Sequence, residues 1–285
     1  MKDLLRKYSK EVDAIIDNAL REDIGPGDIT TDMIVPEKAV LRGVFKAKDI
    51  GVLCGLPIAK KVFLKLDKKA RMTFKKKDGD RIKNGDILGV VRGSARALLT
   101  GERLALNILQ RLSGIATVTK KFVEIARPYK VAVLDTRKTT PNLRILEKYA
   151  VKTGGGENHR MGLYDAVLIK DNHLKLVDLD RAMTDLRRFL PGNIKIEIEV
   201  DSFEMLEKAI SVHPDIIMLD NMTVDMMEKA VARIRGSKCR AKIEVSGGVN
   251  MHTVGDIARL RVDYVSIGSV THSPQAIDIS FKFDF

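Results

Sequence analysis

The sequence predicts an α/β protein in which a compact sheet domain precedes an incomplete α/β barrel. From residue 131 onward, short apolar runs alternate with stretches of helical periodicity, which is the pattern of parallel β-α units. Between about residues 35 and 95, short apolar strands instead follow one another with turn signals such as Asp78-Gly79 and Asn84-Gly85. That pattern favours an antiparallel sheet in the first part of the chain.

Six apolar runs carry the barrel prediction, and helical patterns such as 177–190 and 203–210 separate them. YAVKTGGG (149–156) is a weaker seventh candidate, and Asp201 is the expected N-cap of the helix at 203–210. Residues 131–269 are too few for a complete eight-unit barrel of about 250 residues. We therefore expect an incomplete barrel, with an open doubly wound sheet as the alternative. The six runs are VAVLDT (131–136), DAVLIKDN (165–172), IKIEIEVD (194–201), DIIMLDN (215–221), KIEVSGG (242–248) and YVSIGS (264–269).

Helices are expected on either side of the antiparallel region. Residues 3–20 have apolar side chains at helical spacing, and the Gly-Pro-Gly sequence at 25–27 ends this pattern. A long helix should begin near Ala95, with a break or kink at Ser113-Gly114. The apolar positions of the first helix are Leu5, Tyr8, Val12, Ile15 and Ala19.

Composition narrows the class of protein. The 285 residues suffice for one barrel and a smaller companion domain. The formal net charge of +12 suits anionic partners, but the aromatic content of 5% and the absence of Trp argue against a nucleic-acid-binding module. No signal peptide or bilayer-length apolar run is visible, and two cysteines make no disulfide framework. A cytoplasmic enzyme is the expectation.

Polar residues follow nearly every apolar run, at the strand ends where barrel enzymes hold their active sites. The first ends are basic, and Arg and Lys side chains bind carboxylates and phosphates. The later ends are rich in glycine, and their backbone N–H groups suit phosphate. The residues concerned are Thr136, Arg137, Lys138, His159, Arg160, Lys170, Glu199, Asp220, Ser246, Gly247, Gly248, Gly268 and Ser269.

The middle strand ends are acidic. Glu199 and Asp220 could hold a divalent cation or accept hydrogen bonds from sugar hydroxyls. The residues together predict a substrate with carboxylates at one end and a phosphate at the other. A Schiff base on Lys138 or Lys170 stays open at this point.

Eight segments of the chain resemble the quinolinate phosphoribosyltransferase family, also called carboxylating nicotinate-nucleotide pyrophosphorylase. They follow the family order over nearly the whole chain. Asn142 and Arg261 depart from it by standing where glycine is usual. The segments are EDIGPGDITT (22–31), GERLALNILQRLSGIAT (101–117), DTRKTTPNLR (135–144), YAVKTGGGENHRMGLYDAVLIKDNH (149–173), EIEVDS (197–202), MLDN (218–221), IEVSGGV (243–249) and DYVSIGSVTHS (263–273).

The resemblance implies a fold and a reaction. The fold is an N-terminal α/β sandwich (1–112), on which the tail 271–285 packs, followed by an incomplete, seven-stranded α/β barrel (113–270). The reaction joins quinolinate to phosphoribosyl pyrophosphate with Mg²⁺, and gives nicotinate mononucleotide, pyrophosphate and CO₂ in NAD synthesis. The family works as a homodimer or a larger assembly of dimers, in which Arg103 completes the neighbouring subunit's site.

The resemblance also implies a role for each residue. Arg103, Arg137, His159, Arg160 and Lys170 would bind quinolinate. The phosphoribosyl donor would lie against Thr136, Lys138, Glu199, Asp220, Ser246, Gly247, Gly248, Gly268 and Ser269. Lys138, Glu199 and Asp220 would be catalytic, and the two acids are the candidate direct ligands of Mg²⁺.

Three other functions are weighed against this one. A paralogue with the same scaffold is associated with molybdenum transport, but the intact TRK, HR and IKDN sequences favour the quinolinate enzyme. A Schiff-base lyase acting on a phosphosugar would use Lys138 or Lys170. A basic nucleic-acid-binding protein would show steeply salt-dependent binding.

Overall fold

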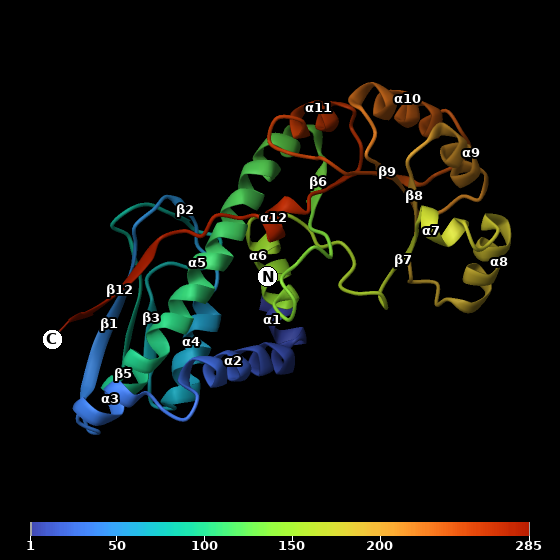
Figure 1. Cartoon of the computed structure of the whole chain (residues 1–285). Coiled ribbons are helices and arrows are strands. Elements are labelled where there is room, and N and C mark those ends of the chain that lie inside the picture. Colours follow the sequence, from blue (N-terminus) through green and yellow to red (C-terminus); the bar gives the residue numbers. More distant parts are fainter. Residues whose placement is uncertain (1, 285) are drawn as a thin grey trace. The chain divides into compact units, whose positions relative to one another are not determined.

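The computed structural model describes residues 2–284, which form two compact units (Figure 1). The first unit comprises residues up to 120, residues 139–155 and the chain from 270 onward. The second comprises residues 121–138 and 156–269. The chain therefore passes between the units more than once.

The first unit is built on a four-stranded antiparallel sheet with the order β12-β1-β5-β3. The last strand packs against the first through aromatic rings, since the centroids of Phe281 and Phe45 lie 4.4 Å apart. Gly43 makes this contact possible, because a Cβ there would lie 2.0 Å from Cζ of Phe281. A short pair, β2 with β4, lies outside this sheet. The strands are β1 (Val40–Ala47), β2 (Gly51–Val52), β3 (Arg71–Phe74), β4 (Arg81–Ile82), β5 (Ile87–Ser94) and β12 (Ile279–Asp284).

Helices accompany this sheet, and several of them differ from expectation. The single helix predicted at 3–20 is two helices that meet at Tyr8, and its buried side is formed by Val12, Ile16 and Leu20. Helix α4 is not predicted by the sequence pattern, which favours strands throughout this region. The helices are α1 (Lys2–Lys7), α2 (Ser9–Ile24), α3 (Ile29–Ile34), α4 (Leu56–Leu66), α5 (Ala95–Ala126), α6 (Arg144–Thr153) and α12 (Ser269–His272).

The prediction of a break at Ser113-Gly114 is wrong, because helix α5 runs without interruption through both residues. Glycine is needed at 114 for a different reason. A Cβ there would lie 2.2 Å from the backbone oxygen of Gln275, so Gly114 permits close approach of the C-terminal segment. Ser113 is buried and its hydroxyl accepts a hydrogen bond from the backbone N–H of Cys54.

The second unit is a parallel sheet with the strand order β6-β11-β10-β9-β8-β7. All six apolar runs predicted as strands are confirmed. The first strand lies beside the last, as in a barrel, whereas a doubly wound sheet places its first strand in the interior. That alternative is therefore excluded. The strands are β6 (Ala132–Leu134), β7 (Val167–Ile169), β8 (Ile196–Val200), β9 (Ile216–Asp220), β10 (Lys242–Ser246) and β11 (Tyr264–Ser266).

The prediction of a seventh strand at 149–156 is wrong, since residues 144–153 form helix α6. A single parallel bridge, Leu134 with Glu157, occupies the next position beside β6. The predicted N-cap of α9 is also wrong by one residue, because Ser202 rather than Asp201 accepts from the backbone N–H of Met205.

The strands of the second unit curve, and α9, α10 and α11 follow their outer side in Figure 1. Asn142 in the first unit and Arg261 in the second both adopt left-handed backbone, with φ of 64° and 54°, at the two positions where the resemblance leads us to expect glycine. The helices and the 3₁₀ helix of this unit are η1 (Arg127–Tyr129), α7 (Asp171–Leu174), α8 (Leu179–Phe189), α9 (Phe203–Ser211), α10 (Val224–Arg235) and α11 (Val254–Arg259).

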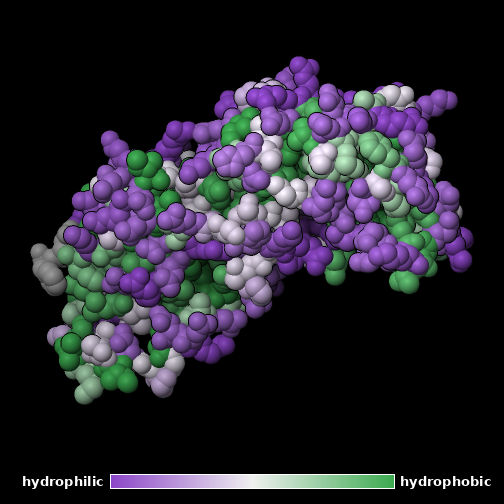
Figure 2. Space-filling view, turned by 45° about the horizontal axis from the view of Figure 1, so that its top comes forward, coloured by the Kyte–Doolittle hydropathy of each residue, from purple (hydrophilic) through white to green (hydrophobic). Residues whose placement is uncertain are grey.

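Hydrophilic residues cover most of the face seen in Figure 2, with hydrophobic patches between them. Within residues 2–284, no helix has both the length and the apolar character that a membrane span requires. The core contains buried aliphatic side chains from strands and helices, and in the first unit also the rings of Phe45 and Phe63.

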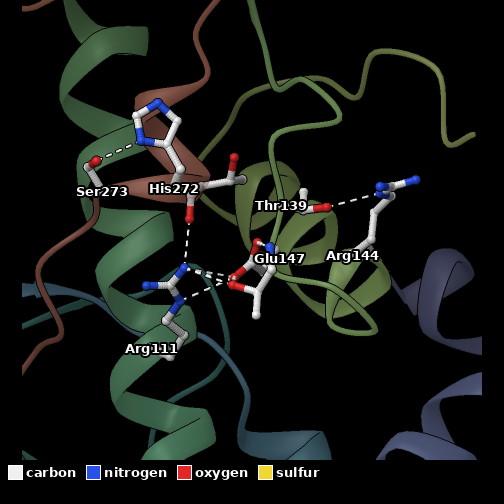
Figure 3. Close-up of polar contacts among 8 residues, drawn as sticks. Arg111, Thr139, Arg144, Glu147, His272 and Ser273 are labelled. Atoms are coloured by element: carbon white, nitrogen blue, oxygen red, sulfur yellow. Dashed lines mark hydrogen bonds and ion pairs between the residues drawn. The ribbon is translucent and has the colours of Figure 1, made fainter.

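A buried ion pair holds α5 and α6 together in the first unit. Figure 3 shows the guanidinium of Arg111 directed at Glu147, whose side chain is fully buried; the N–O distance is 2.8 Å. The same carboxylate accepts from the backbone N–H and the hydroxyl of Thr140, at 3.0 and 2.9 Å. Arg111 also donates to the backbone oxygen of Thr271. The buried carboxylate is therefore balanced by donors from Arg111 and Thr140, and Arg111 also joins it to the segment of Thr271.

We expect Arg111→Met to lower the free energy of unfolding by about 3 kcal/mol, because it leaves a buried carboxylate without its counter-charge. Urea unfolding of the variant and the parent measures the loss. Arg233→Met is the control, since Arg233 pairs with Glu207 on the surface and surface pairs contribute about 0–1 kcal/mol. Equal losses in the two variants would contradict this account.

Candidate active site

Side chains alternate between the two faces of each strand, and this alternation places several glutamate side chains in the barrel interior. Successive side chains of a strand point to opposite faces, so Glu197 and Glu199 of β8 share the face opposite Ile196, Ile198 and Val200. Register then aligns Glu199 with Met218 of β9, and Met218 with Glu244 of β10. Glu199 and Glu244 therefore lie on the same face of the sheet, together with Glu197.

Cationic side chains lie against these acids. Lys170 follows β7, and its Nζ is 2.6 Å from Oε2 of Glu199. Burial lowers the pKa of the Arg160 guanidinium, and the neighbouring Arg137 guanidinium lowers it further. The carboxylates of Glu197 and Glu199 act in the opposite direction on the pKa of Arg160. The guanidinium charges of Arg137 and Arg160 repel each other and therefore favour an anion at this edge of the barrel.

A buried cluster lies beneath Arg160. Nε2 of His159 is 3.0 Å from Oε2 of Glu197 and 3.5 Å from Oε1 of Glu244. Both glutamates are buried, with 2% and 0% of their surfaces exposed. Burial, and next the adjacent Glu197 carboxyl, raise the pKa of Glu244 to about 8. Ser266 of β11 donates a short hydrogen bond to Oε1 of Glu244.

Asp135 anchors the segment that carries His159 and Arg160. Its side chain is fully buried at the end of β6, and it accepts from the backbone N–H of His159 at 3.0 Å and from the amide of Asn158. The hydroxyl of Thr136 accepts from the backbone N–H of Lys138. The TRK sequence therefore begins from a rigid strand end.

The strand ends of β9 and β10 approach one another closely. Asn221 has a φ of 55° and donates from its side chain to Asp220 and from its backbone to the Ser246 carbonyl. Gly247 has a φ of 83°, and a Cβ there would lie 2.3 Å from Oδ1 of Asn221. Only glycine fits that position. Gly248 also has positive φ, and open space surrounds the place of its missing Cβ.

The side chains that could bind a metal ion give little support for a Mg²⁺ site formed by protein ligands alone. In the described part of the chain, the one group of three that converges is His159, Glu197 and Glu244. Its imidazole disfavours Mg²⁺, which prefers oxygen ligands and keeps several waters. Glu199 and Asp220 offer carboxylate oxygens of the right kind, but no third such side chain converges with them among these residues. They fit a cation that arrives with a phosphorylated substrate.

Topology brings the predicted residues of the second unit to one edge of its sheet. Residues 136–138 follow β6, Lys170 follows β7, and Glu199 and Asp220 lie in the last residues of β8 and β9. Ser246 ends β10, with the glycines after it, and Gly268-Ser269 follows β11. Arg103 lies in α5, in the first unit.

Sequence reasoning did not single out Glu197, Glu244 or Ser266 as functional residues. A signal was present, because IKIEIEV and KIEVS each place a charged residue inside an otherwise apolar strand. In a strand covered by helices, such a residue has to point into the barrel.

Comparisons with known proteins cover nearly the whole chain. The model of the quinolinate phosphoribosyl transferase C-terminal domain matches residues 115–282, and that of the N-terminal domain matches residues 28–113. A probable nicotinate-nucleotide pyrophosphorylase (carboxylating) of Bacillus subtilis strain 168 is 39% identical over 93% of this chain and 91% of its own length. Quinolinate phosphoribosyltransferase (decarboxylating) 1b of Nicotiana tabacum is 38% identical over 96% of this chain and 83% of its own length.

Solved structures agree with these matches. The crystal structure of NadC from Streptococcus pyogenes has a TM-score of 0.89, is 43% identical and covers 95% of each chain. Nicotinate-nucleotide pyrophosphorylase from Francisella tularensis has a TM-score of 0.89, is 37% identical and covers 96% of each chain. The chain belongs to the quinolinate phosphoribosyltransferase family.

Proposed function

We propose that this chain transfers the phosphoribosyl group of phosphoribosyl pyrophosphate to quinolinate with loss of CO₂, and so forms nicotinate mononucleotide for de novo NAD synthesis. Family membership gives the reaction class. The single observation that carries the proposal within the site is that Arg137 and Arg160 each lie three residues after the parallel bridge of Leu134 with Glu157, so two guanidinium groups leave the same edge of the barrel and favour an anion there. Quinolinate is such an anion, with two carboxylates on one flat ring.

The arrangement suits the two halves of the reaction. Arginine forks bind carboxylates through two hydrogen bonds, so Arg137 and Arg160 can fix the ring and its nitrogen. When that nitrogen attacks the anomeric carbon, positive charge develops on the sugar, and the carboxylates of Glu199 and Asp220 can stabilise it. The alkylated ring nitrogen then stabilises the carbanion that remains when CO₂ leaves, and a proton from solvent water forms the C–H bond of the product. These steps need positioning and charge, and no side chain has to act as a general base.

The phosphate end and the metal are part of the same proposal. Backbone N–H groups of residues 246–248 and of Gly268-Ser269, together with Thr136 and Lys138, would bind the donor's phosphates. Mg²⁺ bound to the donor supplies charge neutralisation for the departing pyrophosphate. Glu199 and Asp220 are the residues that would hold it.

The assembly and the location extend the proposal. We expect a homodimer or a larger assembly of dimers in the cytoplasm, with Arg103 entering the neighbouring subunit's site. The interaction of Lys170 with Glu199 argues against Lys170 as the lysine of a Schiff-base lyase. A Schiff-base lysine needs a neutral amine, and this ion pair uses the ammonium group.

The activity itself is tested with quinolinate, phosphoribosyl pyrophosphate and Mg²⁺. We expect pyrophosphate and CO₂ to be released in equal amounts, and nicotinate to replace quinolinate poorly because it lacks the second carboxylate. Coupled pyrophosphate detection and labelled CO₂ measure the two products. Folded protein that releases neither product, or a borohydride-trapped lysine adduct, would contradict the assignment.

Arg160→Lys tests the carboxylate fork. The lysine keeps the charge but loses the two-point contact, so we expect KM for quinolinate to rise at least tenfold, about 1.4 kcal/mol. Arg233→Lys is the matched control, because it removes a two-point contact with Glu207 on the barrel exterior. Steady-state kinetics should show the rise in KM for quinolinate in Arg160→Lys and not in Arg233→Lys. An unchanged KM in Arg160→Lys would mean that Arg160 does not bind quinolinate.

The subunit assignment of Arg103 is tested by mixing Arg103→Ala with Arg137→Ala. If Arg103 acts across the dimer, half of the randomly mixed dimers contain one intact site, so about a quarter of the parent activity should return. Subunit exchange is verified with differently tagged chains. Exchange without recovered activity would mean that each site is built within one chain.

A further inference from the structure

Both ring nitrogens of His159 are used inside the protein. Nδ1 accepts a hydrogen bond from the backbone N–H of Arg160, the next residue, at 2.7 Å. Nε2 faces the carboxyl groups of Glu197 and Glu244, at 3.0 and 3.5 Å. The ring therefore connects the backbone of Arg160 to β8 and β10, the two strands on either side of β9.

These contacts fix the form of the imidazole. A nitrogen that accepts from a backbone N–H carries no proton, so the proton of the neutral ring is on Nε2. That proton can then be donated to Glu197 or Glu244. A metal ion at this place would need the lone pair of Nε2, and it would have to displace the proton. The cluster is consequently better described as a hydrogen-bonded clamp than as a metal centre.

The two carboxyl groups of the clamp are enclosed. Oε1 of Glu197 and Oε2 of Glu244 are buried and have no hydrogen-bond partner among the described residues. Ser266 donates to the other oxygen of Glu244 and fixes its orientation. Because two adjacent carboxyl groups in so little water cannot both be charged cheaply, burial and Glu197 hold Glu244 in its protonated form. The clamp thus carries at most one negative charge beneath the cationic residues.

We propose that Glu197 and Glu244 are positioning residues, which hold His159 and through it place the guanidinium of Arg160 for the substrate's carboxylate. The proposal rests on the proposed function for the identity of that substrate. It assigns His159 to the support of the site instead of to direct contact with quinolinate.

The segment around Arg160 is tied at both ends, which explains how the clamp can act on it. Before it, Asp135 accepts from the backbone N–H of His159. After it, Asp165 accepts from the backbone N–H groups of Met161 and Gly162 at 2.7 and 3.0 Å. The guanidinium itself donates to the backbone oxygen of Ala166 at 3.2 Å. Among the contacts just described, the imidazole is the one that reaches across to β8 and β10.

Kinetics separate positioning from simple stability. We expect Glu197→Ala and Glu244→Ala to raise KM for quinolinate at least tenfold, with KM for phosphoribosyl pyrophosphate within threefold of the parent. Glu197→Gln and Glu244→Gln keep an oxygen for the imidazole N–H, and should stay within threefold for both substrates. Ile234→Ala is the control for destabilisation, because Ile234 is 1% exposed in α10 and contacts no proposed substrate. It should lower the melting temperature and leave both KM values unchanged.

The clamp is also measured without turnover, by the ¹⁵N signals of the histidine rings. Among the five histidines of the parent, one ring should be protonated on Nε2 and should exchange that proton slowly with water. The signal of this ring should be absent from His159→Gln. The signal should persist in Glu197→Gln and Glu244→Gln and be lost in the alanine variants.

Two results would overturn the proposal. The first is a His159 ring in the parent that is protonated on Nδ1 or exchanges its proton freely. The second is a loss of quinolinate affinity in His159→Gln while Glu197→Ala and Glu244→Ala keep the affinity of the parent, because His159 would then contact quinolinate directly. If the parent transfers no phosphoribosyl group, the proposed function fails, while the ring signal still decides whether the clamp exists.

Discussion

The buried carboxyl groups on the inner faces of β8 and β10 are the constraint on which the site depends. Glu197 and Glu244 have almost no contact with water, so they require internal donors, and His159 and Ser266 provide them. The imidazole in turn fixes the backbone of Arg160. The buried carboxyl groups in the barrel interior thereby determine where the guanidinium of Arg160 lies. The same principle appears in the first unit, where Glu147 gathers Arg111 and Thr140.

Much of the second unit could be predicted from the sequence because its signals are local. Each parallel strand is an apolar run that ends in polar residues, and all six runs form strands. Since parallel strands end at one edge, the order of the runs is enough to assign residues as distant as Arg137 and Asp220 to one site. The roles of these residues remain predictions, because roles depend on substrates rather than on strand ends.

The errors have physical causes that sequence periodicity does not contain. Residues 149–153 are apolar enough for a strand, yet they continue a helix that begins at Arg144. Ser113-Gly114 has the composition of a helix break, but a tertiary contact with Gln275 requires the missing side chain. Glu197 could be seen in an apolar strand, but its partners His159 and Glu244 come from other elements. Such pairings arise only when the barrel closes.

The pairing of β1 with β12 has a consequence for how the chain is made. Residues Arg42 to Ala47 pair with Ile279 to Asp284, at opposite ends of the sequence. During synthesis β1 leaves the ribosome long before β12, so one of its two edges stays without a partner until residues 279–284 have been made. The barrel strands, by contrast, pair mostly with neighbours in sequence and can assemble meanwhile. The sheet of the first unit is thus completed after the barrel strands, and a chain that lacks β12 would expose the unpaired edge of β1 to other chains.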